Sequence, residues 1–302
     1  MHLNTLAASL LLLLPVTQAI NIISSNDDGW AEINIRTFYD ALMSAGHSVV
    51  ISAPADNRSG TGSFDAPPVK RTHPCEFDSC PANSPPVGFN TSSPRLHWVN
   101  SFPATSIKYG INTLAPKFFN GPPDLAVAGP NVGANLGVTT VFSGTVGAAT
   151  YAAHKAGIPA IAFSGSSGSQ TAWNTPSIPL YSQIYAELSR NLIDSLIASG
   201  TPYLPNDIWL NVNFPEVNNT SCNNVGDFRF VLSRIHHAIL GVTPDDVEIC
   251  GSRRLPTEST VVSTPGCYAS ISVGKASDKQ DADSTIQGVV LNKLGRLLTC
   301  LP

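Results

Sequence analysis

Short apolar segments that alternate with stretches of helical periodicity limit the folds open to this sequence. Ile20–Ser24 and Ser48–Ser52 are apolar, β-branched runs, and residues 31–45 between them place apolar side chains at near-helical spacing before Gly46. Strand, helix and strand in this order predict a βαβ unit. The same alternation continues with strands expected at 124–128, 158–163 and 208–214 and helices at 144–155 and 178–199. We therefore expect an α/β fold, a Rossmann-like, open, mostly parallel sheet with helices on both faces.

Two regions depart from this alternation. Residues 65–100 contain seven prolines and two cysteines, which favour an irregular surface insertion. From residue 240 the periodicity gives way to turn-rich sequence. We interpret residues 240–302 as a C-terminal extension of a single domain that starts at residue 20, rather than as a second core.

The N-terminus carries a targeting pattern. Residues 6–15 form a short apolar core, and Thr17-Gln18-Ala19 is a small-x-small cleavage pattern, which together predict a signal peptide over residues 1–19. The apolar core is too short to span a bilayer. We therefore expect a secreted, extracellular protein that starts near Ile20 and is not attached to a membrane.

Six cysteines follow the predicted signal peptide. An even number in a secreted chain indicates disulfides rather than metal ligands, and no Cys-x-x-Cys motif is present that would suggest zinc. Six cysteines allow many pairings, and we expect Cys75–Cys80 and Cys250–Cys267. The N-glycosylation sequons, which fit a secreted glycoprotein, start at Asn57, Asn90, Asn218 and Asn219.

Charge and motif content exclude several classes of protein. The chain has 17 basic and 21 acidic residues and no basic run, so a polymeric nucleic acid is not expected as a partner. The Gly-x-Ser-x-Gly motif of α/β-hydrolase esterases is absent, so this class of enzyme is not indicated. No Gly-x-Gly-x-x-Gly motif follows the first strand, so a dinucleotide cofactor is not indicated.

Polar segments follow three of the predicted strands, at Asn26–Gly29, Asn57–Ser63 and Gly129–Asn135. In open α/β sheets ligands bind beyond the carboxyl ends of the strands, so these segments are expected to converge. Carboxylate, hydroxyl and amide oxygens suit Mg²⁺, Mn²⁺ or Ca²⁺. A turn in which Asp28 caps the following helix explains the first segment as well.

A glycine-bearing segment, Ser143–Ala149, is placed to open a helix. Free amide groups and the helix dipole at such a terminus attract phosphate. An N-cap followed by small residues for close helix packing is the alternative. The Gly-Lys-Ser/Thr element of a Walker loop is absent.

The order of several motifs resembles that of the survival protein SurE family over residues 20–235. The motifs are Ser25-Asn26-Asp27-Asp28-Gly29, Asn57-Arg58-Ser59-Gly60, Gly129-Pro130-Asn131, Ser143-Gly144-Thr145-Val146-Gly147 and Leu210-Asn211-Val212-Asn213-Phe214-Pro215. The resemblance implies a divalent-metal-dependent phosphomonoester hydrolase of the 5'/3'-nucleotidase or acid phosphatase type. It also implies a small phosphomonoester substrate, such as a nucleoside monophosphate, and a C-terminal extension used in oligomerisation.

The resemblance also implies roles for individual residues. The implied metal ligands, for Mg²⁺ or Mn²⁺ with Ca²⁺ as an alternative, are Asp27, Asp28, Ser59 and Asn131. The implied catalytic residues are Asp27, Asp28 and Asn26, with Asp27 either an in-line nucleophile or a group that orients a water. The implied phosphate contacts are Ser143, Gly144, Thr145 and Ser63, and Asp281 matches a C-terminal aspartate of the family.

Two alternative functions stay open at this point, of which one is a metal-assisted hydrolase of another ester. Residues 101–106 depart from the family pattern beside the pocket, which favours a secreted protein that binds a phosphorylated ligand with little turnover. The intact Asp27, Asp28, Ser59 and Asn131 favour catalysis, because pure binding does not require an open metal site. A homo-oligomer is compatible with either reading.

Overall fold

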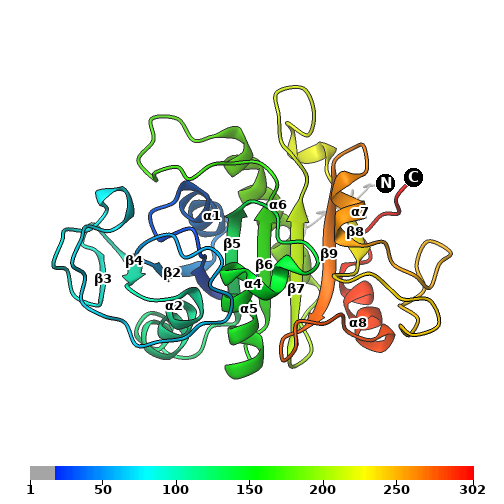
Figure 1. Ribbon diagram of the computed structural model, residues 1–302, viewed down its shortest axis with the longest axis horizontal. Coiled ribbons are helices and arrows are strands. Elements are labelled where there is room, and N and C mark those ends of the chain that lie inside the picture. Colours follow the sequence, from blue (N-terminus) through cyan, green and yellow to red (C-terminus); the bar gives the residue numbers. More distant parts are fainter. Residues whose placement is uncertain (1–17) are drawn as a thin grey trace, which may run out of the picture.

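The computed structural model describes residues 18–302, so residues 1–17 of the predicted signal peptide lie outside the described part. The described chain forms a nine-stranded sheet in the order β3-β4-β2-β1-β5-β6-β7-β9-β8, with helices packed against it (Figure 1). The strands are β1 (Asn21–Ser25), β2 (Ser48–Pro54), β3 (Val87–Asn90), β4 (Ser93–Val99), β5 (Leu125–Val132), β6 (Ala160–Gly165), β7 (Ile208–Phe214), β8 (Arg229–Ser233) and β9 (Tyr268–Lys275).

The sheet is mostly parallel, as predicted. Strands β4, β2, β1, β5, β6 and β7 all run in one direction, and only the β3–β4 and β7–β9 pairs are antiparallel. The chain passes from β1 to β2 on one side and returns to β5 on the other side of β1. The carboxyl end of β1 is therefore the point at which strand order reverses, where such sheets bind ligands.

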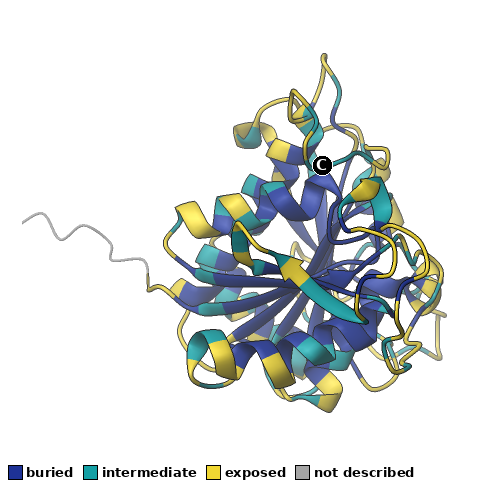
Figure 2. Ribbon diagram, turned by 90° about the vertical axis from the view of Figure 1, so that its left-hand side faces the viewer, coloured by how far each residue is buried: buried dark blue, intermediate teal, exposed yellow. Residues whose placement is uncertain are grey.

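Helices cover both faces of the sheet (Figure 2). Helices α1 (Ile33–Ser44) and α6 (Leu180–Ala198) pack together on one face, and α2 (Pro103–Tyr109) and α5 (Gly144–Lys155) pack together on the other. Ile22 belongs to the first core and its neighbour Ile23 to the second, because successive side chains of a strand point to opposite faces. The remaining α-helices are α3 (Ala115–Phe119), α4 (Thr139–Phe142), α7 (Glu258–Ser263) and α8 (Ser284–Leu294).

Part of the region predicted as an irregular insertion is a strand of the sheet. Strand β4 pairs in parallel with β2, and Leu96, Trp98 and Val99 are buried there. The prediction of an irregular segment over all of 65–100 is therefore wrong for β3 and β4. Proline and charged residues in β4 obscured the alternation of its apolar side chains, and burial against β2 determined the strand.

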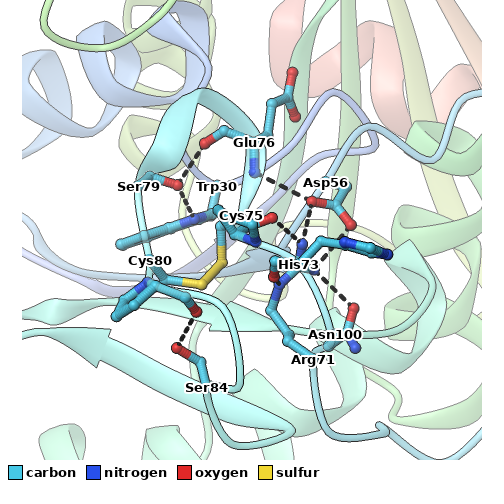
Figure 3. Close-up of a disulfide and its surroundings, with 12 residues drawn as sticks. Trp30, Asp56, Arg71, His73, Cys75, Glu76, Ser79, Cys80, Ser84 and Asn100 are labelled. Carbon is cyan, nitrogen blue, oxygen red and sulfur yellow. Dashed lines mark hydrogen bonds and ion pairs between the residues drawn. A yellow bond between two sulfur atoms is a disulfide. The ribbon is translucent and has the colours of Figure 1, made fainter.

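A short disulfide loop precedes β3. Cys75 and Cys80 are bonded as predicted, with their Cα atoms 4.9 Å apart. The disulfide belongs to a small core with Trp30 and Trp98, whose ring centroids are 5.1 Å apart. In Figure 3 the indole of Trp30 lies beside the loop, and its Nε1 donates a hydrogen bond to Ser79 Oγ at 2.9 Å. The loop is thereby packed onto the chain that follows β1.

The C-terminal region completes the sheet. Strand β9 lies between β7 and β8, and its residues 269–274 are buried. The disulfides here are Cys222–Cys267 and Cys250–Cys300, so the predicted Cys250–Cys267 pair is wrong. That prediction rested on closeness in sequence. Pairing of β8 with β9 brings Cys267 to the loop that contains Cys222, while the chain end runs back to Cys250.

Candidate functional site

Asp27 and Asp28 directly follow β1 and are 2% and 1% exposed. Asn26 shapes the turn that carries them, because its Nδ2 donates to Gly29 O at 2.8 Å and its Oδ1 accepts from Gly29 N at 3.2 Å. Asp28 does not cap the next helix. Glu32 does so by accepting a hydrogen bond from Asn34 N. Asp28 therefore does not have the structural role that the capping alternative assigned to it.

The N-terminus of α5 holds Asp27. Gly144 N donates to Asp27 Oδ2 at 3.0 Å, and the Thr145 hydroxyl donates to Asp27 Oδ1. A Cβ atom at Gly144 would lie 2.8 Å from the Asp27 Cβ, so only glycine permits this approach. Ser143 caps the same helix by accepting from Val146 N at 3.2 Å. The predicted phosphate segment thus lies directly beside the predicted metal ligand.

Asp28 is held from two other segments. Val132 N, at the end of β5, donates to Asp28 Oδ2 at 2.9 Å. Gln170 Nε2, from the loop after β6, donates to Asp28 Oδ1 at 2.6 Å. Sequence analysis did not identify Gln170, because nothing local in a Ser- and Gly-rich loop marks a residue that reaches a strand end so distant in sequence.

A bulge in β5 directs the side chain of Asn131 toward Thr145 and Asp27. The β5–β6 ladder is interrupted between Ala128 and Asn131, where Gly129 has φ +102° and a Cβ would lie 2.2 Å from Phe163 O. Bulges of this kind redirect side chains next to active sites. The Asn131 Oδ1 lies 3.4 Å from Thr145 Oγ1, the hydroxyl that also contacts Asp27. The structure therefore brings Asn131 and Asp27 to one hydroxyl group.

The two predicted serines lie at the solvent side of this group. Ser59 is exposed, and its loop is tied to the aspartates because Arg58 N donates to Asp27 O at 2.6 Å. Ser63 is also exposed and lines a cavity of about 610 Å³ along α5 together with Tyr151 and Lys279. No hydrogen bond joins either serine side chain to Asp27 or Asp28 within residues 18–302.

Burial dominates the electrostatics of the aspartate pair. It raises the pKa of Asp27 despite the hydrogen bonds from Thr145 and Gly144. Burial and the charge of Asp27 raise the pKa of Asp28 well above its usual range. Burial also raises the pKa of Glu76, in the disulfide loop, to about 7. Within the described chain no lysine, arginine or histidine forms an ion pair with Asp27 or Asp28.

This donor set fits a hard divalent cation. Burying two ionised carboxylates that have no cationic partner among the described residues costs free energy unless an external positive charge compensates them. Adjacent amide and hydroxyl oxygens add neutral donors of the type that Mg²⁺ and Mn²⁺ accept. Within residues 18–302 no three histidine, cysteine or acidic side chains are placed so that they could hold a metal ion together, so such a site would depend on Asn131 and Ser59 as well as the aspartates.

Asp281 lies outside this group. Its carboxylate accepts from Ile235 N at 2.6 Å and His236 N at 3.0 Å and faces the buried Arg234 guanidinium. It therefore holds the C-terminal region onto the end of β8, and no contact joins it to Asp27 or Asp28 in the described structure.

Proteins of similar sequence identify the family of this chain. The family model described as Survival protein SurE matches residues 22–236. The chain belongs to the SurE family. An acid phosphatase of Yarrowia lipolytica is 33% identical over 280 residues, which cover 83% of this chain and 78% of that protein. A 5'-nucleotidase SurE of Lawsonia intracellularis is 31% identical over 198 residues, which cover 66% and 67%.

A solved structure agrees on the SurE fold. The crystal structure of the SurE protein from Aquifex aeolicus superposes with a TM-score of 0.59 at 20% identity, covering 90% of this chain and 98% of that one. The predicted family, the predicted fold class and the prediction of a phosphatase or nucleotidase enzyme are confirmed. Within residues 18–302, no helix is long and apolar enough to cross a membrane.

Proposed function

We propose that this SurE-family enzyme hydrolyses small phosphomonoesters, such as nucleoside monophosphates, with a divalent metal ion held by Asp27, Asp28, Ser59 and Asn131. The observation that carries the proposal is the buried Asp27–Asp28 pair, which forms no ion pair with any residue from 18 to 302 and lies beside the N-terminus of α5. A cation and the positive end of a helix dipole in one place suit a phosphate group.

The side chains of this group have separate tasks in the proposed reaction. A divalent ion, when bound, would neutralise the phosphate oxygens as the bond to phosphorus breaks. Thr145 and Gly144 fix the orientation of Asp27, which then either attacks phosphorus in line or orients the attacking water. The exposed Ser59 and Ser63 would meet a substrate that enters from solvent. Asn26 maintains the turn that presents both aspartates.

The chemistry of the donors supports Mg²⁺ or Mn²⁺, with Ca²⁺ as the alternative. Every proposed ligand atom is an oxygen, and Mg²⁺ commonly binds one or two carboxylates while keeping several waters. Zinc would favour histidine or cysteine, and all six cysteines are bonded to each other.

We further propose that the protein is secreted. Three disulfides, two of which join residues 45 and 50 positions apart, fit an oxidising compartment. The Yarrowia relative is an acid phosphatase, which fits the proposed substrate class. Glycosylation at Asn90, Asn218 or Asn219 and homo-oligomerisation remain predictions.

The test is a phosphate-release assay on protein lacking the signal peptide. The protein is stripped with EDTA, and Mg²⁺, Mn²⁺ or Ca²⁺ is added back with nucleoside 5'- and 3'-monophosphates and with a simple aryl phosphate. Phosphate release that requires the metal supports the proposal. Tight binding of a nucleoside monophosphate without release would instead indicate the phospho-ligand-binding alternative.

A further inference from the structure

Glu258 lies beyond the region matched by the family model and yet contacts the catalytic end of the sheet. It opens α7, beside β9 and β8 in Figure 1, and is fully buried. Its Oε1 accepts from Asn211 Nδ2 at 2.7 Å, and its Oε2 accepts from Gly137 N at 3.1 Å. Burying a carboxyl group costs free energy unless the group is hydrogen-bonded, so these two hydrogen bonds stabilise the structure around Glu258.

Gly137 ends the loop that follows Asn131, and the same loop is held at Asn135. Asn213 Oδ1 accepts from Asn135 N at 2.8 Å, and Asn135 O accepts from Asn211 Nδ2 at 2.9 Å. The Asn135 Nδ2 donates to Ser164 Oγ at 2.9 Å. Buried side chains of β6 and β7 therefore hold the middle of this loop, and Glu258 holds its end.

The loop in turn orients Asn131. The Asn131 Nδ2 donates to the carbonyl oxygens of Val132, the last residue of β5, and of Gly133, the first residue of the loop. These two bonds leave the Asn131 Oδ1 directed to Thr145, on the side of Asp27. A shift of the loop would move both carbonyls and rotate the amide away from the aspartates.

We propose that Glu258 is a positioning residue that holds the 133–137 loop, and through it the Asn131 amide, in the geometry needed to bind the metal. The inference rests on the proposed function for the assignment of Asn131 as a ligand. It means that the C-terminal extension is part of the catalytic apparatus although it contributes no group that touches substrate. Partners of this kind around a metal ligand commonly change metal affinity about 10- to 100-fold.

The test compares Glu258→Ala and Glu258→Gln with a matched control, Gln287→Ala. Gln287 is also a buried polar residue of the extension, and it bonds to Asp246, Ala282 and Val247 rather than to the loop. Mn²⁺ affinity is measured by calorimetry, and amide hydrogen exchange by mass spectrometry on peptides covering 131–137. Both are measured on folded protein well below the melting temperature.

We expect Glu258→Ala to weaken Mn²⁺ binding at least about 10-fold and to speed exchange in residues 131–137. Glu258→Gln retains the volume and one acceptor, so it should fold where Ala does not and show a smaller change in the same direction. Gln287→Ala should lower the melting temperature without either effect. Equal losses in the control, or unchanged affinity and exchange in both Glu258 variants, would overturn the inference.

The same measurements separate the two proposals. If the wild-type protein binds Mn²⁺ but releases no phosphate from any substrate, the proposed function is wrong, whereas the Glu258 comparison is still decided by affinity and exchange. If the wild-type protein binds none of Mn²⁺, Mg²⁺ and Ca²⁺, Asn131 is not a ligand and the inference about Glu258 is wrong too.

Discussion

Two pairs of aspartates away from solvent, Asp27 with Asp28 and Asp246 with the partly buried Asp281, have opposite environments in this molecule. Asp246 and Asp281 share the buried guanidinium of Arg234, at 2.9 and 3.5 Å. Asp27 and Asp28 have hydrogen-bond donors but no ion-pair partner in residues 18–302, and burial raises the pKa of both. The first pair carries its own counter-charge and joins two parts of the chain. The second pair receives no counter-charge from the described residues, which agrees with its proposed role as a metal-binding pair.

The largest expected effect concerns the pair without a cation. Asp27→Asn should lower metal-dependent phosphate release on the order of 1,000-fold, because it removes charge and an oxygen ligand where phosphate is bound. The melting temperature should not fall, since the variant also removes a buried charge next to Asp28. Assays of phosphate release and circular dichroism check both parts. Normal turnover by a well-folded variant would remove this pair from the catalytic site.

For Asp246 and Asp281 we expect an effect on stability rather than on phosphate release. Arg234→Met removes the guanidinium shared by the buried Asp246 and the largely buried Asp281 and leaves Asp246 only Arg254, 3.8 Å away, as an ion-pair partner, which should cost about 3 kcal/mol. Urea unfolding measures this loss. Mn²⁺ affinity of the folded variant should stay within about 2-fold of wild type, because Arg234 touches none of the proposed ligands. A metal defect as large as that of Asp27→Asn would end the distinction between the two pairs.

Two of the disulfides should also differ in their effect on stability. Cys222–Cys267 closes a loop of 45 residues, and replacing both cysteines by serine should cost about 4 kcal/mol on the chain-entropy model. Cys75–Cys80 closes a loop of five, for which the same model gives about 2 kcal/mol. Thermal unfolding of the two double variants compares these values, and metal titration of the Cys75/Cys80 variant should show affinity largely unchanged. Loss of metal binding in that variant would mean that the loop helps to shape the catalytic site.

Glu258 should also make the stability of the protein depend on pH. Burial raises the pKa of Glu258 to about 8, from 4.5 in an unfolded chain. The native state therefore retains a proton that the unfolded state releases, so this contribution to stability is full below about pH 4.5 and is lost as the pH rises to about 8. Glu258→Gln cannot titrate. Urea unfolding at pH 5, 6.5 and 8 should show a steeper decline for wild type than for the variant, and parallel declines would show that Glu258 does not titrate in this range.

Much of this architecture is readable from local sequence. The strands β1, β2, β5, β6 and β7 and the helices α1, α5 and α6 were all predictable, because strand and helix periods are properties of neighbouring residues. Asp27, Asp28 and Asn131 were predictable as a group, since the carboxyl ends of parallel strands meet at one edge. The Cys75–Cys80 disulfide followed from short spacing alone.

Features that depend on contacts between distant parts of the chain could be identified only in the folded structure. Strand β4 exists because β2 offers it a buried edge, and Cys267 bonds to Cys222 because β8 pairs with β9. The contacts of Gln170 with Asp28 and of Glu258 with Gly137 join residues more than 100 positions apart. The fold class, the family motifs and the candidate ligands are therefore accessible from patterns of neighbouring residues. Only the folded chain determined which carboxylates receive a counter-charge from the protein, because that depends on whether a distant arginine packs within reach.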